Sequence, residues 1–194
     1  MNDVLLYKSA TQMKMIKGTL PGTKKTKCFV CCYKISNKFM SKVYSLKTVQ
    51  FLPIPLEVAW DFFSSPANLK EITPDNLGFN IVSIHHGDKM YAGQVIEYTV
   101  RPVLNIPLYW MTEITHVEDY KYFVDEQRYG PYSMWHHQHH FKAVDAGVEM
   151  TDIVHYKMPF WFLGDIANVL FVNRQLKTIF DYRFKVVAEK FGVV

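Results

Sequence analysis

A run of about 80 residues, from Phe79 to Met158, alternates apolar and polar side chains with a period of two. This alternation is typical of strands that bury one face, and it constrains the fold more than any other feature. Turn sequences divide the run into strands that we predict near residues 79–85, 92–101, 108–117, 120–129, 133–144 and 148–158. Because the connections between them are short, consecutive strands must be antiparallel neighbours.

Helical patterns flank this run on both sides. A strand over residues 43–51 is followed by a short helix over 56–63 and a second one over 66–72. After the run, apolar residues recur at helical spacing over residues 165–190, which contain neither proline nor glycine. We therefore predict an α+β fold, in which a curved antiparallel sheet, two short helices and a long C-terminal helix enclose a cavity. Asp165 is expected near the positive end of the long helix.

Charge divides the chain of 194 residues into two parts. The first 40 residues hold eight lysines and one aspartate, whereas residues 41–194 hold 14 Lys and Arg against 17 Asp and Glu. The net charge of +4 therefore arises in the first segment, and a basic nucleic-acid-binding domain is not supported. We predict a flexible basic extension over residues 1–41 and one ligand-binding domain over residues 42–194.

The N-terminal extension leaves several interpretations open. Its run Lys24-Lys25-Thr26-Lys27 is either a solvated arm, which is the simpler interpretation, or an electrostatic contact with anionic lipid or nucleic acid. Because ordered patterning starts directly after Met40, translation from Met40 is a further hypothesis. The three cysteines, Cys28, Cys31 and Cys32, are odd in number and confined to this segment, so they form no disulfide framework.

The hydropathy of the sequence indicates where in the cell the protein is expected. No stretch approaches the roughly 20 apolar residues that span a bilayer. Lysines interrupt the apolar residues at the start of the chain, which is not the pattern of a secretory signal peptide. We therefore expect a cytoplasmic protein with no transmembrane segment.

The segment 133–144 carries two histidines on one face of a predicted strand. Trp135, His137, His139 and Phe141 share that face, and the two flanking aromatic residues indicate that it points inward. Two imidazoles on an apolar wall need polar partners, because an unpaired buried polar group costs roughly 1 to 3 kcal/mol. The opposite, outward face is formed by His136, Gln138, His140 and Lys142.

The neighbouring strands place two carboxylates on the same side as these histidines. Alternation puts Asp125 and Gln127 on one face of their strand, and Asp152 and Tyr156 on one face of theirs. Because hairpin connections join these strands to the histidine strand, both carboxylates are predicted within a rung or two of the imidazoles.

Four interpretations of this polar group stay open. The first is a buried hydrogen-bond network in which each aspartate orients a histidine. The second is ligand recognition, with a candidate binding set of Asp125, Gln127, Trp135, His137, His139, Phe141, Asp152 and Tyr156. The third is a metal site, because residues i and i+2 of a strand lie about 6.5 to 7 Å apart, and His137 and His139 could converge on one ion with Asp152 or Asp125. The fourth is acid–base catalysis by either histidine, tuned by Asp125.

The order of elements and several motifs resemble a known superfamily. The motifs are Phe51-Leu-Pro-Ile-Pro-Leu-Glu-Val-Ala-Trp-Asp-Phe-Phe63, Gly130-Pro-Tyr132, Trp135-x-His137-x-His139-x-Phe141 and Asp152-x-Val-x-Tyr156. Together they resemble the START-like, or SRPBCC, ligand-binding superfamily, which includes the Bet v 1-like fold, polyketide cyclases and coenzyme-Q-binding proteins. The similarity covers residues 43–192 and is closest to small bacterial single-domain members. It implies a helix-grip fold with an internal cavity for a lipophilic molecule.

The residue pattern and the family resemblance together predict that this protein is a carrier or sensor. It would bind a hydrophobic small molecule, such as a lipid, an isoprenoid or quinone, or a polyketide-like compound. The alternative is a cyclase, aromatase or dehydratase type of enzyme that uses His137 or His139 as general acid or base, with Asp125 beside it. The chain lacks a nucleophile elbow, a dinucleotide fingerprint and a phosphate loop. We therefore expect no cofactor and no nucleic-acid partner.

Overall fold

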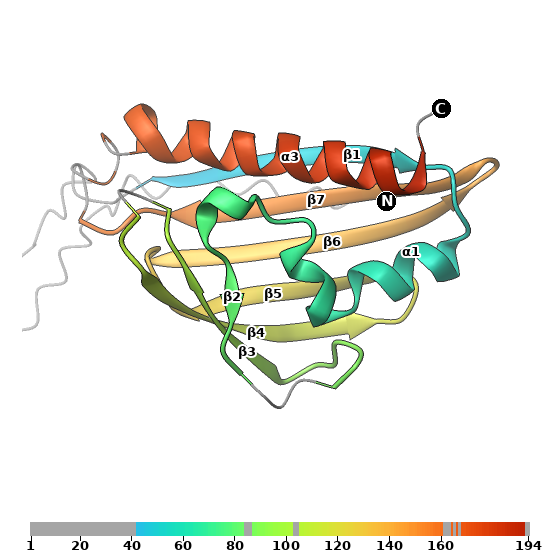
Figure 1. Cartoon of the computed structure of the whole chain (residues 1–194), viewed down its shortest axis with the longest axis horizontal. Coiled ribbons are helices and arrows are strands. Elements are labelled where there is room, and N and C mark those ends of the chain that lie inside the picture. Colours follow the sequence, from blue (N-terminus) through green and yellow to red (C-terminus); the bar gives the residue numbers. More distant parts are fainter. Residues whose placement is uncertain are drawn as a thin grey trace, which may run out of the picture. The chain divides into compact units, whose positions relative to one another are not determined.

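The alternation along the chain produces one antiparallel sheet. The computed structural model describes residues 42–83, 87–102, 105–160, 164, 166 and 168–192. Within these residues, seven strands are arranged in the order β1-β7-β6-β5-β4-β3-β2 (Figure 1). They are β1 (Val43–Leu52), β2 (Asn80–Ile81), β3 (Gln94–Val100), β4 (Leu108–Glu118), β5 (Tyr122–Tyr129), β6 (Met134–Val144) and β7 (Gly147–Lys157). The predicted N-terminal extension, its cysteines and Asp165 lie outside the described residues.

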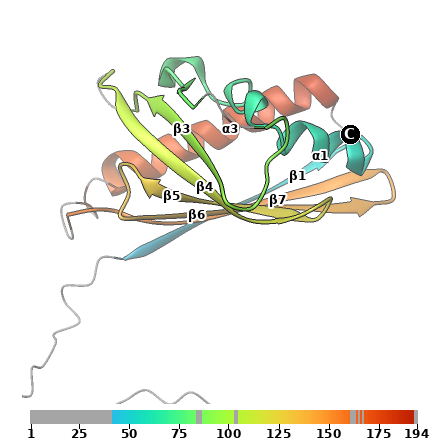
Figure 2. The same cartoon turned by 90° about the horizontal axis from the view of Figure 1, so that it is seen from below.

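The helices lie on one side of this sheet. They are α1 (Leu56–Phe63), the 3-10 turns η2 (Pro66–Lys70) and η3 (Asp75–Leu77), the π-helical turn η4 (Asn168–Val172) and the long helix α3 (Asn173–Phe191). Figure 2 shows α1 and α3 on the same side of the sheet, which curves around them. The predicted α+β helix-grip architecture is thus confirmed. No helix of the described residues is both long and apolar enough to cross a bilayer.

Three elements differ from their sequence predictions. The second short helix is a 3-10 turn. In its described part, the strand predicted near residues 79–85 has regular ladder pairing with β3 at Asn80 and Ile81 only, and the N–H groups of Val82 and Ser83 both donate to the carbonyl of Glu97. The predicted long helix is not a regular α-helix throughout, because the π-helical turn η4 precedes α3, which begins at Asn173. A π turn holds more residues than an α turn, so it shifts the phase of the side chains along a helix.

The core beneath α1 is built from aromatic side chains. α1 buries Ala59, Trp60, Phe62 and Phe63, as its helical spacing predicts. The Trp60 ring meets that of Phe141 on β6 edge to face, with ring centroids 5.5 Å apart. This packing closes one end of the space between the sheet and α3, and it leaves the rest of that space to the site described below.

Candidate functional site

A cavity of about 470 Å³ lies against the inner face of the sheet, with α3 contributing to its wall. This volume falls in the range of roughly 300 to 1,000 Å³ that is usual for small-molecule sites. Most of the wall is apolar, and β3, β4 and α3 contribute Ile96, Val100, Leu108, Ile114, Leu176, Ile179 and Phe180 to it. The alternation of β3 and β4 aims every second side chain into this space.

Strand register brings two histidines and two aspartates together in the sheet. Asp125 on β5 pairs with His137 on β6, and His139 pairs with Asp152 on β7. We call these four residues the His–Asp tetrad. The carboxylates therefore flank the histidine strand from both sides, which is the arrangement that alternation and hairpin connections predict.

The tetrad is a closed ring of imidazole–carboxylate contacts. Nε2 of His137 lies 3.0 Å from Oδ1 of Asp152, and Nε2 of His139 lies 2.9 Å from Oδ2 of Asp125. The second nitrogen of each ring faces the other carboxylate, at 3.4 Å for His137 and 2.8 Å for His139. The 2.8 Å contact of His139 Nδ1 is short but poorly aligned, so this buried atom has no hydrogen-bond partner among the described residues. The ring centroids of the two histidines are 3.8 Å apart.

Burial and neighbouring charges set the protonation of the tetrad. Burial opposes ionisation of both carboxyls, but contacts with the two histidines lower the pKa of Asp125 and hold that of Asp152 well below its usual range. Burial and the charge of His139 lower the pKa of His137. Burial alone would lower the pKa of His139, but its hydrogen bond to Asp125 and its close contact with Asp152 outweigh burial and raise this pKa. The two imidazoles and a nearby arginine thus lie beside two carboxylates whose charge they offset.

That arginine is Arg183 on α3, which the sequence analysis missed. Its side chain lines the cavity, is only 13% exposed, and places Nη1 3.6 Å from Oδ1 of Asp152. Nε and Nη1 are buried and have no hydrogen-bond partner among the described residues. Arg183 follows Phe180 by three residues and precedes Val187 by four, so it falls on the buried stripe of the helix. A charged residue at that spacing is the signal that could have identified it.

Four of the eight predicted binding residues line the cavity: Asp125, Trp135, His137 and His139. Asp152 is not part of the cavity wall and instead contacts the two histidines and Arg183. Tyr156 does not line the cavity; it packs in a core cluster with Leu176 and Phe180, and its ring lies 5.4 Å from that of Tyr44.

The other two predicted binding residues, Gln127 and Phe141, do not line the cavity themselves. Gln127 holds the corner between β5 and β6, because its amide donates to the carbonyl of Tyr132 at 2.6 Å and accepts from its N–H at 3.2 Å. A Cβ at Gly130 would lie 2.4 Å from Oε1 of this glutamine, so a larger residue there would displace the glutamine amide from its backbone partner. Phe141 belongs to the core beneath α1.

A second polar group lies in the cavity wall at β3 and β4. The hydroxyl of Tyr98 lies 2.8 Å from Oγ1 of Thr112, and burial raises the pKa of this tyrosine. Both residues occupy inward positions of their strands, as does Trp110. The indole Nε1 of Trp110 is buried without a hydrogen-bond partner among the described residues. These side chains add polar atoms to a wall that, apart from the tetrad and Arg183, is largely apolar.

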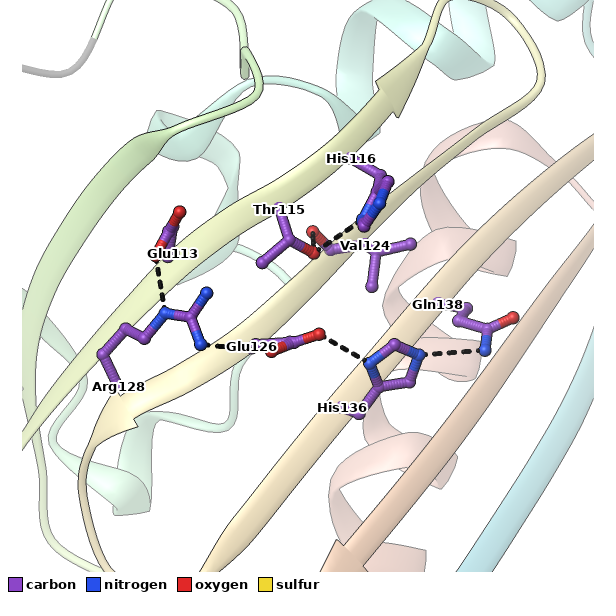
Figure 3. A network of polar contacts seen from close by, with 8 residues as sticks. All are labelled: Glu113, Thr115, His116, Val124, Glu126, Arg128, His136 and Gln138. Atoms are coloured by element: carbon purple, nitrogen blue, oxygen red, sulfur yellow. Dashed lines mark hydrogen bonds and ion pairs between the residues drawn. The ribbon is translucent and has the colours of Figure 1, made fainter.

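The outward face of the sheet carries a separate polar network, shown in Figure 3. Arg128 bridges Glu113 and Glu126, at 2.5 and 3.2 Å. Glu126 contacts Nδ1 of His136 at 3.0 Å, and Nε2 of the same ring lies 3.0 Å from Nε2 of Gln138. Exposed pairs of this kind contribute about 0 to 1 kcal/mol each. The network therefore describes a solvated face, distinct from the tetrad on the opposite side of the same strands.

Comparison with solved structures identifies the fold. The crystal structure of TTHA0849 from Thermus thermophilus matches 76% of this chain and 97% of its own, with a TM-score of 0.60 and 13% identity. The match to the crystal structure of Ara h 8.0201 covers 77% of this chain and 98% of that protein, with a TM-score of 0.55 and 16% identity. The match to major latex-like protein 151 from Panax ginseng covers 77% of this chain and 97% of that protein, with a TM-score of 0.55 and 13% identity.

Sequence comparisons were negative, since no protein-family model and no curated protein matches the chain. At identities of 16% or less, the structural matches establish architecture alone. They agree with the strand order, the curved sheet and the long final helix described above. The chain therefore has the Bet v 1-like, helix-grip fold of SRPBCC proteins.

Proposed function

We propose that this protein binds a hydrophobic small molecule, of the lipid, isoprenoid, quinone or polyketide-like kind, as a carrier or sensor. The observation that carries this proposal is the cavity of about 470 Å³ with its mainly apolar wall. Burial of apolar surface contributes about 25 cal/mol per Å², so an apolar molecule in this space gains affinity without specific polar contacts. The fold supports the proposal, because similar cavities recur in proteins of this architecture.

The polar groups of the wall define the kind of ligand further. Asp125, His137 and His139 lie on one strand pair of a wall that is otherwise largely apolar. Pockets of this type use a few polar groups to orient a molecule whose body is held by apolar contacts. We therefore propose an amphipathic ligand, whose polar group lies at the tetrad and whose apolar part extends along β3, β4 and α3.

Binding is tested with a pair of substitutions on one strand. Ile96 lines the cavity and is 1% exposed, whereas its neighbour Val95 is 43% exposed. Ile96→Phe fills part of the cavity, and Val95→Phe adds the same ring to the outer surface. We expect native mass spectrometry of the protein from its own host to detect a bound molecule, which Ile96→Phe reduces and Val95→Phe retains. Equal occupancy in both variants, or a bare chain in every sample, would refute cavity binding.

A second candidate function is acid–base catalysis on the bound molecule. It is favoured by His137, which lines the cavity, has a lowered pKa and forms a hydrogen-bonded pair with Asp152. A neutral imidazole held by a carboxylate is suited to accept a proton. Mass spectrometry of the molecule released from His137→Gln separates the two functions. A carrier would retain the same compound in smaller amount, whereas an enzyme would accumulate a different, unreacted compound.

A further inference from the structure

We propose that the tetrad is a site for a divalent transition-metal ion, in which His137, His139 and Asp125 supply the ligand atoms and Asp152 orients the two imidazoles. This inference does not rest on the nature of the lipophilic ligand. It concerns a side-chain cluster in the cavity wall, whose atoms are already close enough to surround one ion.

The three ligand residues converge on a single region. One nitrogen from each histidine and one carboxylate oxygen of Asp125 lie within 4.8 Å of one another. Bonds of about 2.0 to 2.1 Å to a tetrahedral zinc ion imply ligand atoms roughly 3.3 Å apart. Oδ2 of Asp125 lies 3.4 Å from Nδ1 of His137 and 2.9 Å from Nε2 of His139. Little movement of the strands is therefore needed to admit an ion.

Asp152 has the position of an orienting carboxylate. Its Oδ1 lies 3.0 Å from Nε2 of His137 and 2.8 Å from Nδ1 of His139, the nitrogens that face away from Asp125. Metal-binding histidines usually donate their second N–H to such a carboxylate, which fixes the tautomer. The contact with His139 requires a rotation of the ring to align. Arg183 pairs with Asp152 at 3.6 Å and so supports the orienting group.

A cation can replace the hydrogen-bonding proton in this arrangement. When Asp152 accepts the N–H of both rings, the remaining imidazole lone pairs are directed at the carboxylate of Asp125, and a cation between these three electron-rich atoms offsets their repulsion. A set of two histidines and one carboxylate with open positions suits Zn²⁺ or Fe²⁺. Asp125, His137 and His139 all line the cavity, so the open positions would face a bound molecule.

Metal titration of the full chain tests this site. Cys28, Cys31 and Cys32 are first replaced by serine, because thiolates bind the same ions. After treatment with EDTA, this chain is titrated with Co²⁺, followed by visible absorption, and with Zn²⁺, followed by calorimetry. We expect one ion per chain. Asp125→Asn and His137→Gln should abolish binding, and Asp152→Asn should weaken it by about ten- to a hundredfold.

His136→Gln is the matched control, because His136 is the next residue of the same strand and lies in the outward network. It should bind cobalt as tightly as the parent. The proposal is overturned if the parent shows no one-to-one binding, or if Asp125→Asn binds as tightly as the parent. Asp125→Asn preserves side-chain shape, so it decides the matter if His137→Gln fails to fold by circular dichroism. Occupancy by the lipophilic molecule is measured separately in EDTA, which keeps failure of cavity binding distinct from failure of the metal site.

Discussion

Nη1 of Arg183 on α3 lies 3.6 Å from Oδ1 of Asp152 on β7, so an ion pair joins the long helix to the sheet beside the cavity. The two side chains are 13% and 9% exposed, so solvent screens the pair only weakly. The same carboxylate oxygen contacts both histidines of the tetrad. The helix therefore contributes charge to a group that is otherwise formed by three strands.

Replacing this arginine should cost much of the stability of the fold. In Arg183→Met the buried carboxylate of Asp152 loses the arginine and keeps only the two histidines, and breaking a buried pair costs up to about 3 to 5 kcal/mol. Arg174→Met on the exposed side of the same helix should change stability by less than about 0.5 kcal/mol. Urea denaturation of both variants measures the difference in the free energy of unfolding. Similar midpoints for the two variants would show that the ion pair contributes little.

Acid should destabilise the protein through Asp152. The folded-state pKa of this carboxyl is well below its usual value, so its stabilising contribution is present above the unfolded pKa of about 3.9 and is lost as pH falls through the folded pKa. The free energy of unfolding, measured in EDTA between neutral pH and acid, should fall in this range. In Asp152→Asn the dependence should be shallower. An unchanged slope in this variant would assign the acid sensitivity to other carboxylates.

The two histidines of the tetrad should titrate in opposite directions from the ordinary value of about 6.5. Contacts with both carboxylates raise the pKa of His139, whereas burial and the charge of His139 lower that of His137. The contribution of His139 to stability should therefore be fully present below about pH 6.5 and be lost as pH rises through its folded pKa. NMR titration of labelled imidazoles in EDTA measures both values, and a higher pKa for His137 than for His139 would contradict this assignment.

Two aromatic residues on one face of β6 should have separable effects. Trp135 lines the cavity, whereas Phe141 packs against α1 and is not among the described residues of the cavity wall. Phe141→Leu should lower stability by roughly 1 to 2 kcal/mol and leave the affinity for a fluorescent fatty acid unchanged. Trp135→Leu should lower that affinity. Probe titration and thermal unfolding of both variants provide the comparison, and a loss of affinity in Phe141→Leu would place that residue in the binding site.

Alternation along single strands was sufficient to predict which side chains face inward. Asp125, His137, His139 and Asp152 were assigned to one side of the sheet from their positions alone, because the period of a strand is two. Hairpin connections then limited their separation, since neighbouring strands pair directly. Both arguments depend on local geometry, which the order of residues specifies.

Contact with the cavity could not be predicted in the same way. Phe141 shares its strand face with Trp135 and His139, but α1 covers that part of the sheet and excludes Phe141 from the cavity wall. Gln127 is likewise on the same face of its strand as Asp125, but its amide forms hydrogen bonds with the backbone of Tyr132. These outcomes depend on which element covers each part of the sheet.

The sequence by itself determined the strands, the long helix and the inward direction of the histidines, because these follow from residue spacing within single elements. Only the tertiary structure decided that Arg183 meets Asp152 and that the two imidazoles and Asp125 lie within 4.8 Å of one another. Those contacts join residues that are distant in sequence. Their distances depend on the curvature of the sheet and on the path of α3 across it, which arise from the packing of all the elements together.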